Sequence, residues 1–208
     1  EKAHNPVAVV INKCDHEAAD FERKFNQLRG SFGNKCTMIQ FPVNAGAGFN
    51  AVIDVLKGKM LVWKAEGGAP ELKDIPAEYA EKVEEMRSQL SEAAAEADET
   101  LLDKFLGEGL TDEEIMQGLK SVYADGSMYP VLCCSGLKDM GVRRLMDFLN
   151  GMAPSPANFS YPTVDGKKVS PDAKAPTSIY VFKTSVEPHI GEVNYFRVMQ
   201  GTIHNGDD

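Results

Sequence analysis

A short apolar run at residues 7–11 is followed at once by the polar cluster Asn12-Lys13-Cys14-Asp15. Runs this short and this rich in β-branched residues are typical of buried strands in a parallel sheet. Open α/β sheets bind their ligands beyond the carboxyl ends of such strands, which is where this cluster lies. The feature therefore predicts an α/β fold with a ligand site at residues 12–15.

Asn-Lys-x-Asp is the guanine-binding motif of GTP-binding proteins, and its residue types fit that base. Guanine presents two neighbouring donors, N1–H and the N2 amino group, and the Asp15 carboxylate can accept both. Adenine has an acceptor at N1 and no amino group at C2, so it would leave the carboxylate unpaired at a cost of ~1–3 kcal/mol or more. Asn12 is expected to bond the other edge of the base, while the stem of Lys13 covers its plane. The same residues are common in solvated turns, so the motif alone does not establish a site.

A second apolar run at residues 129–134 leads into Ser135-Gly136-Leu137-Lys138, and helical periodicity follows over residues 140–152. GTP-binding domains carry a Ser-Ala-x loop at the equivalent place, where a backbone N–H meets guanine O6. Two strand–loop–helix units that each supply half a guanine site are hard to obtain by chance. The predicted guanine-binding residues are Asn12, Lys13, Asp15, Ser135, Gly136 and Leu137.

The chain between these loops has its own regular pattern. Residues 38–43 are predicted to form a strand, and residues 51–63 a β-hairpin. A helical pattern runs over residues 74–106, and its length predicts a kink or a break into two helices. Thr111 and Glu114 have the spacing of a capping box ahead of another helix. On the helix at residues 140–152, the side chains expected on one side are Val142, Leu145 and Leu149.

The composition of the chain argues for a globular core and against broad RNA binding, membrane insertion and disulfide or zinc sites. The 208 residues include 43% hydrophobic residues, enough for a sizeable core, and the net charge is −9. That charge argues against holding RNA phosphates by broad electrostatics.

No apolar run is long enough for a transmembrane helix and the amino terminus lacks a signal-peptide pattern, so we expect a cytoplasmic protein with no membrane partner. The cysteines, which lack disulfide or zinc spacing and are expected to be buried free thiols, are Cys14, Cys36, Cys133 and Cys134.

The two loops and the segments between and after them follow one another in the same order as in elongation factor G, the GTPase that drives ribosomal translocation. The chain resembles that family. The resemblance covers essentially the whole chain. Asn12-Lys13-Cys14-Asp15 with Ala19-Asp20-Phe21 is similar to the family's Asn-Lys-Met-Asp and Ala-Asp-Phe segments. Further matching segments are Phe49-Asn50-Ala51-Val52-Ile53-Asp54-Val55-Leu56, Ala95-Glu96-Ala97-Asp98-Glu99, Pro154-Ser155-Pro156 and Tyr195-Phe196-Arg197-Val198.

The resemblance implies the domain organisation. The fold class is α/β: the C-terminal part of a P-loop-type GTPase G domain with an inserted α+β subdomain, followed by the first strands of a translation-factor β-barrel. The expected parts are G domain 1–34, inserted subdomain 35–126, G domain 127–156, linker 157–177 and the start of the β-barrel domain 178–208.

The sequence contains no Gly-x-x-x-x-Gly-Lys-Ser/Thr loop and no Asp-x-x-Gly switch with its following histidine. We therefore expect a fragment of a longer polypeptide with no catalytic residue or metal site of its own, inactive alone and without bound nucleotide. GTP or GDP with Mg²⁺ is the ligand that the resemblance implies for the full-length protein.

Two functions follow from the resemblance. The full-length protein is either a GTP-hydrolysing translocase, or a ribosome-binding factor G paralogue with weak or no GTPase activity.

Gly136 stands where the family usually has Ala, and this change is expected to loosen the loop rather than alter base choice. The implied partner is the ribosome, with tRNA and mRNA contacted only indirectly.

Three acidic residues, Glu92, Glu96 and Glu99, recur with Asp103 at helical spacing and are predicted to share one face of the long helix at residues 74–106. From spacing alone, a solvated acidic face is the simpler interpretation. The resemblance implies a partner instead, because the corresponding helix of elongation factor G meets the C-terminal domain of the ribosomal stalk protein. We therefore expect these three residues to pair with lysines of the stalk.

Overall fold

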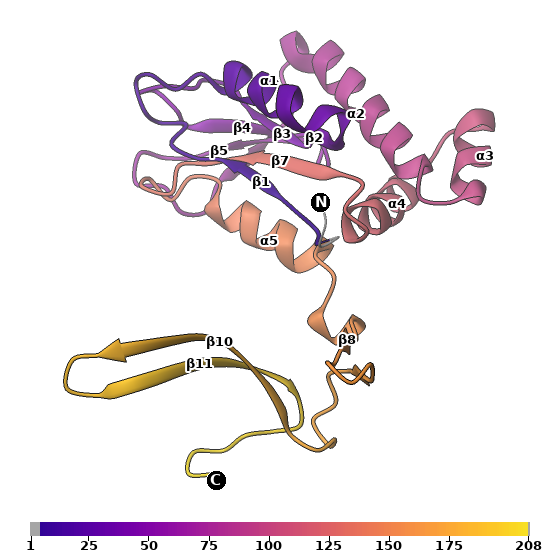
Figure 1. Cartoon of the computed structure of the whole chain (residues 1–208). Coiled ribbons are helices and arrows are strands. Elements are labelled where there is room, and N and C mark those ends of the chain that lie inside the picture. The colour runs from indigo at the N-terminus through magenta and orange to yellow at the C-terminus, as the bar shows by residue number, and fades with distance from the viewer. Residues whose placement is uncertain (1–4, 208) are drawn as a thin grey trace. The chain divides into compact units, whose positions relative to one another are not determined.

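The computed structural model describes residues 5–207 and divides into two compact units, one ending at Ala153 and the other beginning at Pro154 (Figure 1). The first unit is a mixed α/β structure that contains both loops of the predicted guanine site. The second is built mainly from short strands and one long hairpin. Within the described residues, no helix is both long and apolar enough to span a membrane.

The centre of the first unit is a parallel three-stranded sheet with the order β1 (Val9–Ile11), β7 (Tyr129–Cys133), β2 (Cys36–Met38). Its middle strand, β7, is buried along its whole length, as expected for a parallel sheet covered on both faces. Because β1 and β7 are parallel neighbours, their carboxyl ends meet at the same edge of the sheet. The predicted strand at residues 129–134 is confirmed.

A second sheet continues from the first and has the antiparallel order β3 (Gln40–Pro42), β4 (Ala51–Asp54), β5 (Lys59–Val62), β6 (Glu71–Lys73). Strands β4 and β5 form the predicted hairpin. The prediction of one strand over residues 38–43 is wrong, because the chain passes from one sheet to the other at Ile39. Its N–H donates to the carbonyl of Val131 (3.3 Å) and its carbonyl accepts from Val55 N–H (3.1 Å).

Within residues 5–153, five α-helices complete the first unit. They are α1 (Phe21–Phe32), α2 (Ala80–Ala95), α3 (Glu99–Gly107), α4 (Asp112–Ala124) and α5 (Val142–Met152). In Figure 1, α1 and α5 lie on opposite faces of the sheet. In α4 the predicted capping box of Thr111 and Glu114 is present. In α5 the buried residues are Arg144, Phe148 and Met152, whereas Leu149 is exposed. Arg144 turns inward because it pairs with the buried carboxylate of Asp54.

The long helical pattern is broken in two, as its length predicted. Helix α2 ends at Ala95, and Asp98 starts α3 by accepting a hydrogen bond from Leu101 N–H (2.9 Å). Glu92 therefore lies in α2, Glu96 caps the end of α2, and Glu99 opens α3. The prediction that these three acids share one continuous helical face is wrong, because the side chain of Asp98 makes it a better cap than a helix-interior residue.

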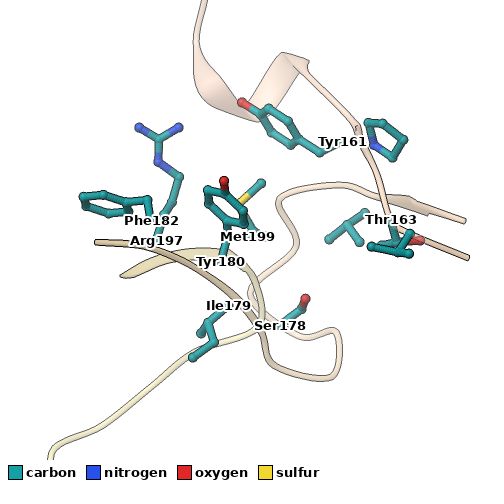
Figure 2. Close-up of a pocket in the computed structure, with 11 residues that line it drawn as sticks. Tyr161, Thr163, Ser178, Ile179, Tyr180, Phe182, Arg197 and Met199 are labelled. Carbon is teal, nitrogen blue, oxygen red and sulfur yellow. The ribbon is translucent and has the colours of Figure 1, made fainter. Parts of the chain in front are cut away.

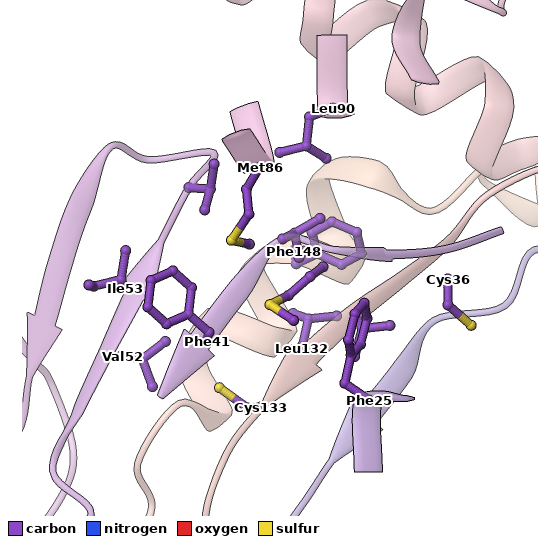
Figure 3. Close-up of a cluster of buried hydrophobic side chains, with 14 of the residues drawn as sticks. Phe25, Cys36, Phe41, Val52, Ile53, Met86, Leu90, Leu132, Cys133 and Phe148 are labelled. Carbon is purple, nitrogen blue, oxygen red and sulfur yellow. The ribbon is translucent and has the colours of Figure 1, made fainter. Parts of the chain in front are cut away.

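One hydrophobic core includes residues of both sheets and of the helices that cover them (Figure 3). Phe25 of α1, Phe41 of β3 and Phe148 of α5 belong to the same cluster as Leu132 of β7 and Leu90 of α2. The residues between the two predicted guanine loops therefore share their core with the parallel sheet. All four cysteines are buried free thiols, as predicted.

The second unit contains a 3₁₀ turn (Pro156–Asn158) and the short pair β8 (Tyr161–Pro162) and β9 (Lys168–Val169). Its main element is the antiparallel hairpin of β10 (Ser178–Glu187) and β11 (Gly191–Gln200). Several large apolar side chains of this hairpin, including Tyr180, Phe182 and Val186, are exposed.

Candidate functional site

Asn12 follows the last residue of β1 and joins the two predicted loops. Its side-chain oxygen Oδ1 accepts hydrogen bonds from Lys13 N–H (2.7 Å) in its own loop and from Gly136 N–H (3.0 Å) in the second loop. The Cys134 thiol lies 3.5 Å from the same oxygen. Lys13 has a left-handed backbone with φ of 62°, which turns the chain sharply after the strand. The side-chain carbonyl of Asn12 is thus occupied by protein donors, and its Nδ2 amino group is the part left for a ligand.

The second loop is closed by backbone hydrogen bonds. Ser135 N–H donates to the carbonyl of Met140 (2.8 Å), and Met140 N–H donates to the carbonyl of Ser135 (3.1 Å). The Ser135 hydroxyl, which is fully buried, accepts from Lys138 N–H (3.2 Å). Leu137 at the tip is 91% exposed, so it faces solvent. The loop is a preformed turn at the carboxyl end of β7.

Asp15 reaches from the first loop to the second. A hydrogen bond with the Ser135 side chain lowers the pKa of Asp15, and the nearby charge of Lys138 lowers it further. The carboxyl group therefore stays ionised at neutral pH and acts only as a hydrogen-bond acceptor. Together with Asn12, this places a free amide donor and a carboxylate acceptor beside one closed backbone turn. Such a set suits a planar ligand that offers both donors and acceptors.

The structure brings all six predicted guanine-binding residues into these two adjacent loops, but it does not bring the three predicted stalk-binding acids to them. Glu92 and Glu96 instead border a depression of about 570 Å³ whose lining also includes Arg29 and Lys35. Glu99 is exposed in the first turn of α3. The described residues contain no group of three or more His, Cys, Asp or Glu side chains placed to hold a metal ion.

A separate apolar pocket of about 660 Å³ lies within the second unit (Figure 2). The side chains of Tyr161, Tyr180 and Met199 gather around it. Arg197 supplies the charged part of its lining. The pocket contains none of the predicted site residues.

Three further residues, none of them predicted as part of the site, donate hydrogen bonds to the backbone of the two loops or of the strand that leads into the second. Gly46 N–H donates to the carbonyl of Cys14 (2.8 Å), and Gly68 N–H donates to the carbonyl of Asp139 (3.1 Å). The side-chain amide of Gln40 donates to the carbonyl of Cys133 (2.9 Å) in the buried interior. All three belong to the antiparallel sheet or its loops, and their contacts are long-range. Only the glycines carried a signal in the sequence, as turn residues, and that signal does not identify what they contact.

The chain is similar to known proteins in sequence and in structure. The family model described as the elongation factor Tu GTP-binding domain matches residues 1–155 of the chain. A crystal structure of a protein from Thermus thermophilus is similar to this chain with a TM-score of 0.80 and 28% sequence identity. The match covers 99% of this chain and 29% of the Thermus protein, so the chain spans less than a third of that protein's length. Because the family model covers most of the chain, including both loops, the protein belongs to the elongation factor Tu GTP-binding domain family of translational GTPases.

Proposed function

We propose that the loops at the carboxyl ends of β1 and β7 bind the guanine base of GTP or GDP. The observation that carries this proposal is that Asn12 Oδ1 accepts hydrogen bonds from both Lys13 N–H and Gly136 N–H. These bonds join the two loops and leave the Asn12 Nδ2 amino group as the donor for a ligand. With Oδ1 occupied, Nδ2 can donate to an acceptor on the outer edge of guanine. Asp15, kept ionised by Ser135, accepts from N1–H and the N2 amino group.

The remaining loop residues complete the base contacts. Gly136 N–H already has Asn12 as its acceptor, whereas Leu137 N–H has no hydrogen-bond partner within residues 5–207 and can donate to guanine O6. The stem of Lys13 covers one face of the base. Ser135 contacts Asp15 rather than the base and holds that carboxylate in place.

We further propose that the complete protein is an elongation factor G-type GTPase that binds GTP or GDP with Mg²⁺, binds the ribosome and promotes translocation. One feature favours this type among the family's members: the elements from β3 to α4 that lie between the two loops. Base recognition would be the same in a paralogue with weak hydrolysis, because it uses only residues of these two loops.

Nuclear magnetic resonance of the ¹⁵N-labelled chain tests base recognition, since it detects weak binding. Millimolar GDP should shift the backbone amides of Lys13, Gly136 and Leu137, whereas ADP should not. Asp15→Asn replaces one acceptor by a donor and should weaken GDP binding by about 1–3 kcal/mol, or ~5–150-fold. Xanthosine diphosphate, with a carbonyl at C2, should then bind the variant better than GDP does.

Equal shifts with GDP and ADP would exclude a guanine site at these loops. Unchanged selectivity in the Asp15→Asn variant would show that Asp15 does not contact the base. Glu17→Gln is the matched control, since it removes an exposed charge two residues away and should leave the GDP response unchanged.

For the partner, we propose that Glu92, Glu96 and Glu99 pair with lysines of the ribosomal stalk protein's C-terminal domain. All three side chains are exposed, which favours contact with a partner. Because they flank a helix break, the stalk would meet an acidic corner rather than a stripe. Reversing all three to Lys should slow association with the isolated stalk domain and weaken its salt dependence. An unchanged association rate at low salt would refute the pairing.

A further inference from the structure

The loop between β5 and β6, residues 63–70, packs directly against the backbone that follows Ser135-Gly136-Leu137. Gly68 N–H donates to the carbonyl of Asp139 (3.1 Å). At Gly67, a Cβ atom would lie 1.9 Å from the carbonyl oxygen of Lys138. Real Cβ atoms do not approach backbone oxygens this closely, so only glycine lets the two loops meet here. The φ of Gly67, 74°, also favours glycine.

The loop between β3 and β4, residues 43–50, supports the other half of the site. Gly46 N–H donates to the carbonyl of Cys14 (2.8 Å), inside the Asn12–Asp15 segment. This loop is held in shape by its own bonds, because Asn44 Nδ2 donates to the carbonyl of Gly48 (2.6 Å) and to Asn50 Oδ1 (3.0 Å). The first base-contacting loop therefore rests on a preformed turn.

Trp63 connects the two supporting loops. Its backbone N–H donates to the carbonyl of Asn50 (2.8 Å), at the end of the loop of residues 43–50. Its indole Nε1–H donates to the carbonyl of Gly68 (3.0 Å), within the loop of residues 63–70. The side chain is buried, so both loops are fixed to the edge of the hairpin formed by β4 and β5.

The same sheet is also tied to the strand and helix on either side of the second base-contacting loop. Gln40 of β3 donates to the carbonyl of Cys133 at the end of β7 (2.9 Å). Asp54 of β4 forms a buried two-point ion pair with Arg144 of α5. Residues of one antiparallel sheet and its loops therefore contact the chain at three places: at Cys133 before the loop between β7 and α5, at Asp139 within it, and at Arg144 after it.

We propose that the antiparallel sheet β3–β6 sets the position of both base-contacting loops, and that Gly67 is a positioning residue for guanine recognition. This inference rests on the proposed function of those loops. Antiparallel pairing fixes the register of β4 and β5, and this register determines where Gly46 and Gly67 present their backbones. A displacement of residues 63–70 is transmitted to Lys138 and then to Ser135-Gly136-Leu137. Through the bond between Gly136 and Asn12 it also reaches the first loop.

Gly67→Ala, compared with Gly109→Ala in the full 208-residue chain, tests the proposal. Both glycines have positive φ, 74° and 85°, so both substitutions impose similar backbone strain. Only the methyl group at position 67 collides with a neighbour, since nothing lies within 4 Å of a Cβ at Gly109, which follows α3 outside the supporting loops. We expect Gly67→Ala to shift the ¹⁵N and amide proton resonances of Gly136 and Lys13 and to weaken the GDP response on the order of tenfold. Gly109→Ala should do neither, and amides of β4 and β5 should stay unchanged in both.

The proposal would be overturned if the amide chemical shifts of Gly136, and likewise those of Lys13, were the same in the two variants. This comparison is made without nucleotide, so it remains decisive even if the wild-type chain shows no GDP selectivity and the proposed function fails. If Gly67→Ala does not fold, Trp63→Phe is the second variant. It removes the indole bond to Gly68 and leaves Lys138 unobstructed, and it should shift the same two amides. Unshifted amides in Trp63→Phe would then refute the positioning role.

Discussion

Gly136 lies where the two loops of the proposed guanine site meet, yet the backbone conformation there does not require glycine. Its φ is not in the left-handed region, and a Cβ there would sit 3.6 Å from both Asn12 Nδ2 and Oδ1, an ordinary contact. We predict that Gly136→Ala stabilises the first unit by about 0.4–1 kcal/mol, because alanine restricts the unfolded chain without straining the folded one. Urea unfolding followed by the fluorescence of Trp63, the single tryptophan, measures the change.

The control for this prediction is Gly141→Ala. Gly141 has φ of 85° and a Cβ there would lie 2.9 Å from the carbonyl oxygen of Cys133, so this variant should be destabilised. A fall in stability for Gly136→Ala would show that the loop depends on glycine flexibility. In that event Gly136 would be a functional departure from the alanine usual in elongation factor G.

At the scale of elements, the start of α4 shows how a local motif and a tertiary contact combine. Thr111 and Glu114 form a complete capping box, and Lys104 of α3 bonds to the Glu114 carboxylate. The Lys104 contact, followed by the Thr111 N–H bond, lowers the pKa of Glu114 from 4.5 to about 2. Because the folded pKa is depressed, this stabilising contribution is complete above pH 4.5 and is lost as the pH falls towards 2.

We therefore predict that Glu114→Gln lowers stability at about pH 7, and that its difference from wild type shrinks steadily between pH 4.5 and about pH 2. Thermal unfolding at a series of pH values measures this. Glu113→Gln removes a charge from the same helical turn but not the capping acceptor, so its effect should be smaller. A difference between Glu114→Gln and wild type that does not depend on pH in this range would contradict the ion pair with Lys104.

At the scale of the whole first unit, Asp54 and Arg144 join the antiparallel sheet to α5. The Asp54 side chain is 1% exposed and that of Arg144 is 9% exposed, so neither charge is well hydrated. We predict that Arg144→Met destabilises the unit by about 3–5 kcal/mol, because it leaves the Asp54 carboxylate buried without a partner. Adding Asp54→Asn should restore most of this loss, since asparagine keeps an acceptor for Lys57 N–H. Unfolding in urea followed by Trp63 fluorescence measures both variants.

An exposed ion pair provides the comparison. The Lys59 ammonium lies 2.7 Å from Asp74, with side chains 47% and 93% exposed, so Lys59→Met should cost far less stability than Arg144→Met. If Arg144→Met costs no more than Lys59→Met, the buried pair does not hold the sheet to α5.

The sequence by itself determined the strand–loop–helix units, the hairpin of β4 and β5, the broken long helix and the capping box at Thr111. These features depend on contacts between residues close in the chain, where hydrophobic period and cap chemistry act directly. The two loops could be expected to lie together because parallel neighbouring strands end at the same edge of a sheet, and they do so in the structure.

Only the tertiary structure decided which residues hold those loops in place. Gly67 meets Lys138 and Gly46 meets Cys14 across long stretches of chain, and the pattern of local residues carries no information about such pairs. The passage between sheets at Ile39 and the inward turn of Arg144 also depend on contacts with residues far away in the sequence. A buried charge or a sheet junction is stable only with a distant partner, so its position follows from packing rather than from periodicity.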